Sequence, residues 1–205
     1  MSSSTLMVIL PLAALYVAFL LWYGGRGKPM SRDEIERLLA PLRARVHDDI
    51  GRSHLAEVER LVARDEGREF VMHNVIRYRK KALYPPGHEF GESAPAADRR
   101  YGKAIVPHLL RYGCLPVFIG KRSGHFIEPE GIDEWDIVAM VRYRSLRDFL
   151  RFANAITQER ITVHKWAAIE NTQVFPVQPI VSLIFVRGAV GAVLAALALL
   201  ALALT

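Results

Sequence analysis

The chain has 205 residues, of which 51% are hydrophobic, and its 27 Lys and Arg against 21 Asp and Glu give a formal net charge of +6. This composition excludes a disordered chain, because disordered chains lack the apolar residues that a core requires. The single cysteine, Cys114, excludes an internal disulfide framework and is typical of a reducing compartment.

Two long uncharged runs lie near the ends of the chain. Leu6 to Tyr23 comprises 18 residues and Gly188 to Leu204 comprises 17, all without charge. Helices of this length span about 25 to 27 Å, close to the hydrocarbon thickness of a bilayer. We therefore predict transmembrane helices over residues 6–23 and 180–204. A cleaved signal peptide is the alternative for the first run, but no positive charge precedes it and a poor cleavage context follows it.

The charges that flank these runs predict an orientation. Arg26, Lys28 and Arg32 follow the first run, and Arg187 precedes the second. The positive-inside rule then predicts a multi-pass membrane protein of the bacterial inner-membrane type, with a cytoplasmic central domain and both termini outside. The basic excess is explained by contact with anionic membrane lipid. Nucleic acid is not an expected partner, because basic and acidic residues are interleaved and no DNA-reading motif occurs.

A helical neck is predicted over residues 31–64. Ser31 and Glu34 form a capping box, and apolar residues then recur at helical spacing. A second short helix follows Ser53. This amphipathic pair could rest on anionic lipid or pack on the domain, and the mixed signs of its charges favour packing.

The remainder, residues 69–178, is predicted to be an α+β domain. Its order is strand–helix–strand, repeated once, which is the split βαβ or ferredoxin-like arrangement. Ile76-Arg77-Tyr78-Arg79 and Val141-Arg142-Tyr143-Arg144 form a short repeat that ends the first strand of each half. We predict that these two strands are adjacent and parallel at the centre of the sheet. The expected strands are 69–79, 115–120, 134–144 and 172–177, and the expected helices are 97–112 and 145–160.

Two segments resemble a known superfamily. The strand Val138–Arg144 running into Ser145–Leu150, and the closing segment Ala168–Pro176, look like the second half of small dimeric α+β barrel proteins. That superfamily includes antibiotic-biosynthesis-type monooxygenases and haem-degrading enzymes. The resemblance covers about residues 69–178 and includes no catalytic signature of a named member. It implies a homodimer whose sheets pair into a barrel, and it is the only basis for expecting monooxygenase-like chemistry.

Strand alternation separates two faces of the predicted sheet. Met72, Ile76 and Tyr143 belong to an apolar row that should pack under the helices. The opposite row is apolar in its middle, and we predict that it forms a ligand cavity. If the strands are parallel, four arginines gather at one end of this row, where they would orient an acidic group. The alternative is a solvated strand end whose arginines pair with nearby acids. The predicted ligand-binding residues of this row are Val75, Met140, Arg77, Arg79, Arg142 and Arg144.

Two histidines complete the candidate site. His73, on the same row, is the predicted catalytic residue, as a general base or as a haem or metal ligand. The alternative is a hydrogen-bonded histidine in a dimer interface. His88 lies in the long loop Lys80–Pro95, which could close over the cavity as a lid, or it is an ordinary exposed loop residue. No spacing predicts a metal site, and no motif indicates a cofactor.

Two classes of function follow. The first is a membrane-anchored domain that binds an apolar or amphipathic small molecule, with monooxygenase-like activity implied by the resemblance alone. The second is a non-catalytic subunit that uses the sheet face for self-association or for docking another membrane protein. The long loop favours the first class, and the lack of a catalytic constellation favours the second.

Overall fold

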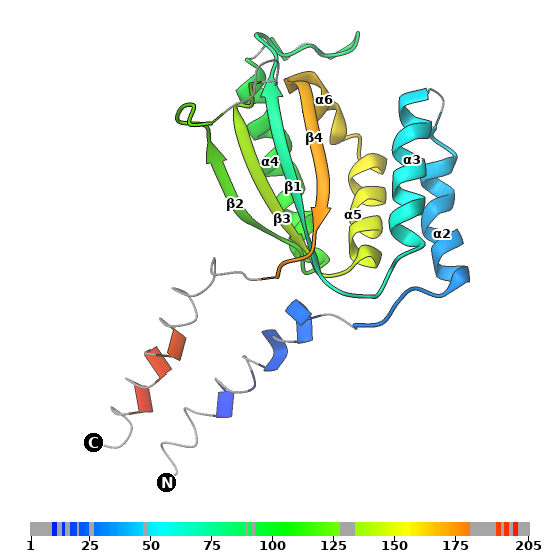
Figure 1. Cartoon of the computed structure of the whole chain (residues 1–205), viewed down its shortest axis with the longest axis vertical. Helices are drawn as coiled ribbons and strands as arrows, with labels where there is room; N and C mark the ends of the chain where they lie inside the picture. The colour runs from blue at the N-terminus through cyan, green and yellow to red at the C-terminus, as the bar shows by residue number, and fades with distance from the viewer. Residues whose placement is uncertain are drawn as a thin grey trace. The chain divides into compact units, whose positions relative to one another are not determined.

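The computed structural model describes residues 27–46, 49–88, 90–91, 93–127 and 134–180, with short stretches nearer the two ends (10–11, 14, 17–19, 21–24, 192–193, 195–196 and 199–200). The chain forms two compact units. One unit comprises Met1–Gly25 with Pro179–Thr205, and in it the rings of Phe19 and Tyr23 stack with centroids 5.4 Å apart. The other unit, Arg26–Gln178, contains the sheet and its helices (Figure 1).

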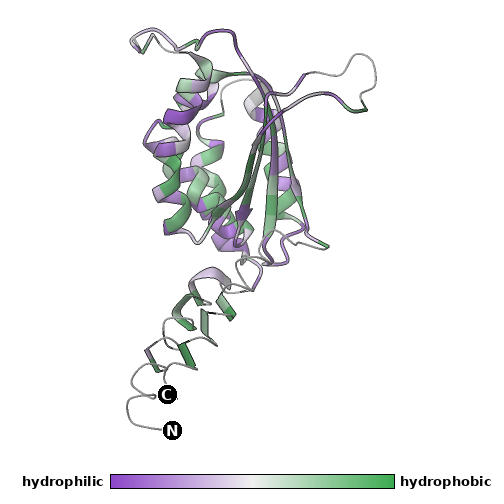
Figure 2. Cartoon of the chain, turned by 90° about the vertical axis from the view of Figure 1, so that its left-hand side faces the viewer, coloured by the Kyte–Doolittle hydropathy of each residue, from purple (hydrophilic) through white to green (hydrophobic). Residues whose placement is uncertain are grey.

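The larger unit is an α+β domain, which confirms the predicted fold class. Its four strands are β1 (Phe70–Tyr78), β2 (Leu115–Lys121), β3 (Ile137–Tyr143) and β4 (Ile169–Val177). Helix α4 (Ala94–Arg111) connects β1 to β2, and α5 (Leu146–Gln158) with α6 (Thr162–Ala168) connects β3 to β4. The helices lie on one side of the sheet (Figure 2).

The sheet has the order β2-β3-β1-β4, and every neighbouring pair is antiparallel. The predicted adjacency of β1 and β3 is therefore confirmed. Their predicted parallel direction is wrong, since Phe70 lies opposite Tyr143 while Ile76 lies opposite Ile137. The chain returns through α4, so that β2 runs in the direction of β1, and β3 then reverses beside β2. Because β3 runs opposite to β1, the two copies of the repeat, 76–79 and 141–144, lie at opposite ends of the sheet.

The helix-covered face of the sheet forms the core. The ring of Tyr143 stacks on Phe70 with centroids 5.4 Å apart and meets Phe149 edge-on at 5.0 Å. Met72 and Ile76 are buried on the same face, as the alternation predicted. Asn74 is the polar member of the row, and its amide donates hydrogen bonds to the carbonyls of Met72 and Ala139.

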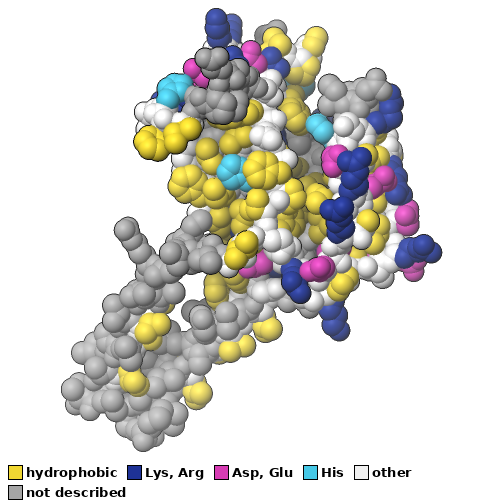
Figure 3. All heavy atoms as spheres, in the orientation of Figure 1, with side chains coloured by type: hydrophobic (Ala, Val, Ile, Leu, Met, Phe, Trp, Pro, Cys, Tyr) yellow, Lys and Arg dark blue, Asp and Glu magenta, His cyan; other side chains and the backbone are white. Residues whose placement is uncertain are grey.

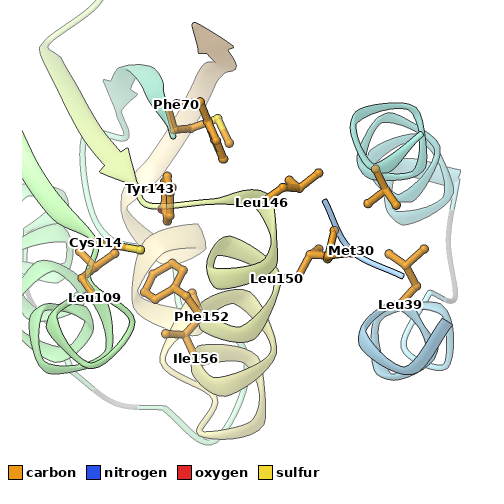
Figure 4. Close-up of a cluster of buried hydrophobic side chains, with 12 residues drawn as sticks. Met30, Leu39, Phe70, Leu109, Cys114, Tyr143, Leu146, Leu150, Phe152 and Ile156 are labelled. Carbon is orange, nitrogen blue, oxygen red and sulfur yellow. The ribbon is translucent and has the colours of Figure 1, made fainter. Parts of the chain in front are cut away.

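The two N-terminal helices pack on this core. Helix α2 (Arg32–Arg43) begins after Ser31, whose Oγ accepts a hydrogen bond from the backbone N–H of Glu34, as predicted for a cap. Helix α3 (Asp49–Val62) follows it. Leu146 and Leu150 of α5 extend toward Met30 and Leu39 (Figure 4). Helix α5 thus lies between the sheet and the helical pair.

The predicted membrane location is contradicted. Within the described residues, no helix combines the length and the apolar character that crossing a bilayer requires. Helix α4 has 18 residues, but charged side chains such as Asp98 and Lys103 interrupt it. The runs Leu6–Tyr23 and Gly188–Leu204, from which the expected multi-pass arrangement was argued, lie partly outside the described residues.

Candidate functional site

The candidate site is the sheet face that the helices leave uncovered, which we call the uncovered face. Its residues come from alternate positions of β1 and β3, and antiparallel partners lie on the same face of a sheet. His73 lies opposite Met140, and Val75 lies opposite Val138. The structure therefore places His73, Val75 and Met140 on one face, as alternation predicted.

The edge strands extend this arrangement into a row across all four strands. Phe118 of β2 lies opposite Met140, and Phe175 of β4 lies opposite His73. The row is Phe118–Met140–His73–Phe175. Apolar side chains gather over the strands, with a histidine among them (Figure 3). Phe118 is 47% exposed and Phe175 is 38% exposed, so the row ends at the surface in two aromatic rings.

His73 has an unusual environment within this row. Its ring stacks on Phe175 with centroids 4.9 Å apart and planes inclined by 30°. Its Nδ1 atom is buried and has no hydrogen-bond partner among the described residues. Leaving a buried polar atom unpaired costs about 1–3 kcal/mol. A buried N–H without an acceptor is rarer than a buried lone pair, so we assign the proton of the neutral ring to Nε2. Nε2 is then the nitrogen that remains for a ligand.

The surroundings of His73 do not include the partner that acid–base catalysis usually requires. A general base is normally oriented by a second polar group, most often a carboxylate. Across the described part of the chain, no side chain forms a hydrogen bond with the His73 ring. No group of three or more His, Cys, Asp or Glu side chains in that part is placed to hold a metal ion. His73 therefore lies among apolar side chains, with no orienting carboxylate in the part of the chain that the structure describes.

The structure does not bring the four predicted arginines together. Arg142 lies opposite Val71, at the end of the sheet where β1 begins. It is 3% exposed, and its Nε donates to Glu69 Oε2 at 2.8 Å while Nη1 donates to the Gly113 carbonyl at 3.1 Å. Arg144 pairs with Asp148 one helical turn later, with Nε and Oδ2 2.8 Å apart. This ion pair raises the pKa of Arg144 above its ordinary value.

The other two arginines lie at the opposite end of β1. Arg77 lies across from Asn171 and pairs with Glu170, whose Oε2 is 3.2 Å from Arg77 Nε. The backbone N–H of Arg79 donates to the Ala168 carbonyl at 2.9 Å, and its Nε is buried without a hydrogen-bond partner among the described residues. The antiparallel register therefore divides the predicted anion site into two distant pairs.

His88 lies apart from this row, in the segment that follows β1. Its ring faces Tyr84 with centroids 6.4 Å apart and planes inclined by 11°, and Phe90 lies at the same centroid distance. Like His73, it has a buried Nδ1 without a hydrogen-bond partner in the described residues. Of the predicted site, only His73, Val75 and Met140 meet at the centre of one face.

The sequence prediction missed the two aromatic ends of the row. Phe118 and Phe175 lie in edge strands that each contain a proline, Pro116 in β2 and Pro176 in β4. Alternation within those strands places both rings on the same face as their partners in β3 and β1. The alternation within each edge strand was therefore visible in the sequence. The strand order was needed to show that the two rings continue the row that contains Met140 and His73.

This geometry defines an α+β domain with a four-stranded antiparallel sheet, one face of which carries an exposed aromatic ring at each edge strand. No family model matches the sequence, and no curated protein matches it. Among solved structures it is similar to RPA0582, a protein of unknown function from Rhodopseudomonas palustris, with 24% identity and a TM-score of 0.55 over 63% of this chain and 94% of that chain. The methylated RPA0582 protein gives 22% identity and a TM-score of 0.52 over 77% of this chain and 97% of that chain. At this level of identity the similarity shows the fold alone.

Proposed function

We propose that this protein pairs with a second copy through the uncovered face and binds a small apolar or amphipathic molecule between the two sheets. The observation that carries the proposal is the row Phe118–Met140–His73–Phe175, with the unpaired Nδ1 of His73 at its centre. The proposal also assigns the domain to the ferredoxin-like arrangement. Its support is the β-α-β-β-α-β order of elements and the sheet order β2-β3-β1-β4.

The exposed aromatic rings support association through the face. Contiguous exposed apolar side chains on a folded domain mark a surface that contacts another molecule. Association through the sheet edges is disfavoured, because Pro116 and Pro176 each remove a backbone donor from an edge strand. A second copy is a fitting partner, since apolar rows related by a twofold axis cover one another without needing complementary charges.

His73 supports ligand binding within the paired faces. An apolar lining with a few polar groups is the usual composition of small-molecule sites. Met140 and Phe175 supply the apolar lining, and Nε2 of His73 supplies one hydrogen bond. The monooxygenase-like chemistry that the resemblance implied would use the same enclosed space. Binding is the function proposed, because no orienting carboxylate accompanies His73 among the described residues.

The association can be tested by replacing one exposed aromatic side chain of the row with a charged one. Sedimentation velocity of the purified full chain should report a dimer for the wild type and a monomer for Phe175→Arg. Val106→Arg is the matched control, because Val106 is 39% exposed but lies on α4, on the other side of the sheet. Val106→Arg should remain dimeric. A dimeric Phe175→Arg variant would contradict the proposal.

Ligand binding needs a separate measurement. Native mass spectrometry of the full chain should detect a co-purifying small molecule, and His73→Leu should lower its occupancy while the dimer persists. The alternative function is association without a ligand, favoured by the lack of a polar partner for His73 in the described residues. A dimer that carries no small molecule before or after the His73 substitution would establish that alternative.

A further inference from the structure

A second candidate site lies where the segment after β1 crosses the junction of α5 and α6. A hollow of about 420 Å³ opens there, and its volume is within the range of small-molecule pockets, about 300–1,000 Å³. Leu83, Val163 and Ala167 contribute its apolar lining, and His88, Arg160 and Trp166 contribute polar and aromatic groups. The hollow shares no residue with the uncovered face, so its function is independent of the one proposed above.

The wall formed by the crossing segment is held in place by hydrogen bonds. The backbone N–H of Leu83 donates to the Ala167 carbonyl at 2.9 Å, and the Tyr84 hydroxyl lies 2.9 Å from Nδ1 of His164. The Phe90 ring packs against Tyr84 with centroids 4.9 Å apart. These contacts join the crossing segment to α6. A ligand would therefore meet a preorganised wall, which lowers the entropic cost of binding.

A turn positions His88 in this wall. The backbone N–H of His88 donates to the Pro85 carbonyl at 3.3 Å, and Gly87 has a φ of 86°. Pro86 followed by a glycine with positive φ is the pattern of a type II turn. Nδ1 of His88 is buried and unpaired among the described residues, which leaves Nε2 as the nitrogen available to a ligand.

Arg160 occupies a position where an arginine is unexpected. It follows the end of α5 with a φ of 56°. Its N–H donates to the Thr157 carbonyl, and the N–H of Ile161 donates to the Ile156 carbonyl, which together form the Schellman motif. Glycine is the usual residue at this position, because a side chain there destabilises the backbone. An arginine at a position that favours glycine suggests a function for its guanidinium.

The charges around the hollow favour an anion. No hydrogen bond or ion pair involves the exposed Arg160 guanidinium within the described part of the chain. The neighbouring Lys165 does not line the hollow, because its ammonium lies between the rings of Trp166 and Tyr101, where burial lowers its pKa. Trp166 is 50% exposed, so its indole can contact a ligand. A guanidinium beside an exposed indole and an apolar lining is complementary to a planar ring that carries one carboxylate.

We propose that this hollow binds a small aromatic carboxylate. The aromatic ring packs against Trp166 and the apolar lining, and the carboxylate accepts hydrogen bonds from Arg160. His88 donates a further hydrogen bond from Nε2. The guanidinium provides two parallel donors, which match the geometry of a carboxylate better than that of a neutral ligand.

Isothermal titration calorimetry of the full chain with 2-naphthoate tests the proposal. The wild type should bind 2-naphthoate and should bind the neutral analogue 2-naphthamide much more weakly. Arg160→Asn keeps a residue that tolerates positive φ, and it should weaken binding of 2-naphthoate by about tenfold or more. Trp166→Leu should weaken it as well. Arg37→Gln, which removes an exposed arginine from α2, is the control and should bind as the wild type does.

Three results would overturn the proposal. The first is no binding of 2-naphthoate to the wild type at millimolar concentration. The second is equal affinity for the wild type and Arg160→Asn, with Arg160→Gly measured as a further variant in case Arg160→Asn does not fold. The third is equal binding of inorganic phosphate or cyclohexanecarboxylate, which would show a general anion site instead of a site for an aromatic ring.

Discussion

Arg77 and Arg142 lie on the same face of the sheet but at opposite ends of it. Arg142 lies opposite Val71 near the start of β1, and Arg77 lies six residues further along the same strand. Each guanidinium has a carboxylate partner of its own, Glu69 for Arg142 and Glu170 for Arg77. The two ion pairs differ greatly in burial, since the side chain of Arg142 is almost inaccessible and that of Arg77 is well exposed.

This difference predicts effects of different size when each arginine is replaced by alanine. Arg142→Ala should lower the free energy of unfolding by about 1–3 kcal/mol, because it removes buried charge-assisted hydrogen bonds to Glu69 and Gly113. Arg77→Ala should change it by less than about 1 kcal/mol, because exposed ion pairs contribute little. Urea denaturation followed by tryptophan fluorescence measures both. Similar losses for the two variants would contradict the assigned burial.

Gly67 and Gly102 form a second contrasting pair. Gly67 has a φ of 71°, and a Cβ there would lie 2.2 Å from the Lys28 carbonyl carbon. Gly67→Ala should therefore lower the free energy of unfolding by about 1–3 kcal/mol or more. Gly102 lies within α4, and a Cβ there would meet nothing within 4 Å. Gly102→Ala should raise stability by about 0.5–1 kcal/mol, because alanine loses less backbone entropy in a helix. Thermal melts should shift in opposite directions, and a shared direction would refute the prediction.

Glu34 joins α2 to α5 and should make stability depend on acid pH. Its Oε1 accepts a hydrogen bond from Arg147 Nε at 2.8 Å, and this bond holds the pKa of Glu34 below its ordinary value of 4.5, although burial acts in the opposite direction. A carboxylate whose pKa is lower in the folded state stabilises the fold above its ordinary pKa. This contribution is lost as the pH falls through the folded-state pKa.

Glu34→Gln should therefore destabilise the protein at pH 7 by about 1–3 kcal/mol and should reduce the loss of stability between pH 5 and pH 3. Glu66→Gln is the control, because the Glu66 side chain is well exposed and pairs only with the equally exposed Arg68 in the described residues. Urea denaturation at each pH gives the comparison. An acid dependence identical in Glu34→Gln and the wild type would show that another carboxylate is responsible.

Cys114 should resist alkylation in the native state. It is fully buried, and burial raises the pKa of its thiol to about 11. The thiolate is the reactive form, so at pH 8 iodoacetamide should label the folded chain about a hundredfold or more slowly than the chain in urea. The sequence contains one cysteine, so total alkylation followed by mass spectrometry reports this site alone. Equal rates in the folded and unfolded chain would contradict the burial of Cys114.

Local patterns in the sequence determined much of the domain. Residues that alternate along a strand point to opposite faces whatever the strand pairs with, so the core row with Met72 and Tyr143 and the opposite row with His73 were both predictable. The hydrogen bond from the Glu34 N–H to Ser31 Oγ joins residues three apart and was predicted correctly, whereas the Glu34 carboxylate of the predicted capping box accepts from Arg147 instead. The α+β class followed from the order of such local elements.

Tertiary structure decided which of these residues meet. The direction of β3 relative to β1 depends on how the chain returns through α4 and β2, which no four-residue repeat encodes, and this reversal separated Arg77 from Arg142. Phe175 reaches His73 only because β4 adds to the far edge of β1. Arg160 and His88, 72 residues apart in the chain, line one hollow because hydrogen bonds join the segment after β1 to α6. Side-chain direction is a local property of the backbone, whereas the meeting of distant side chains depends on strand order and packing across the whole domain.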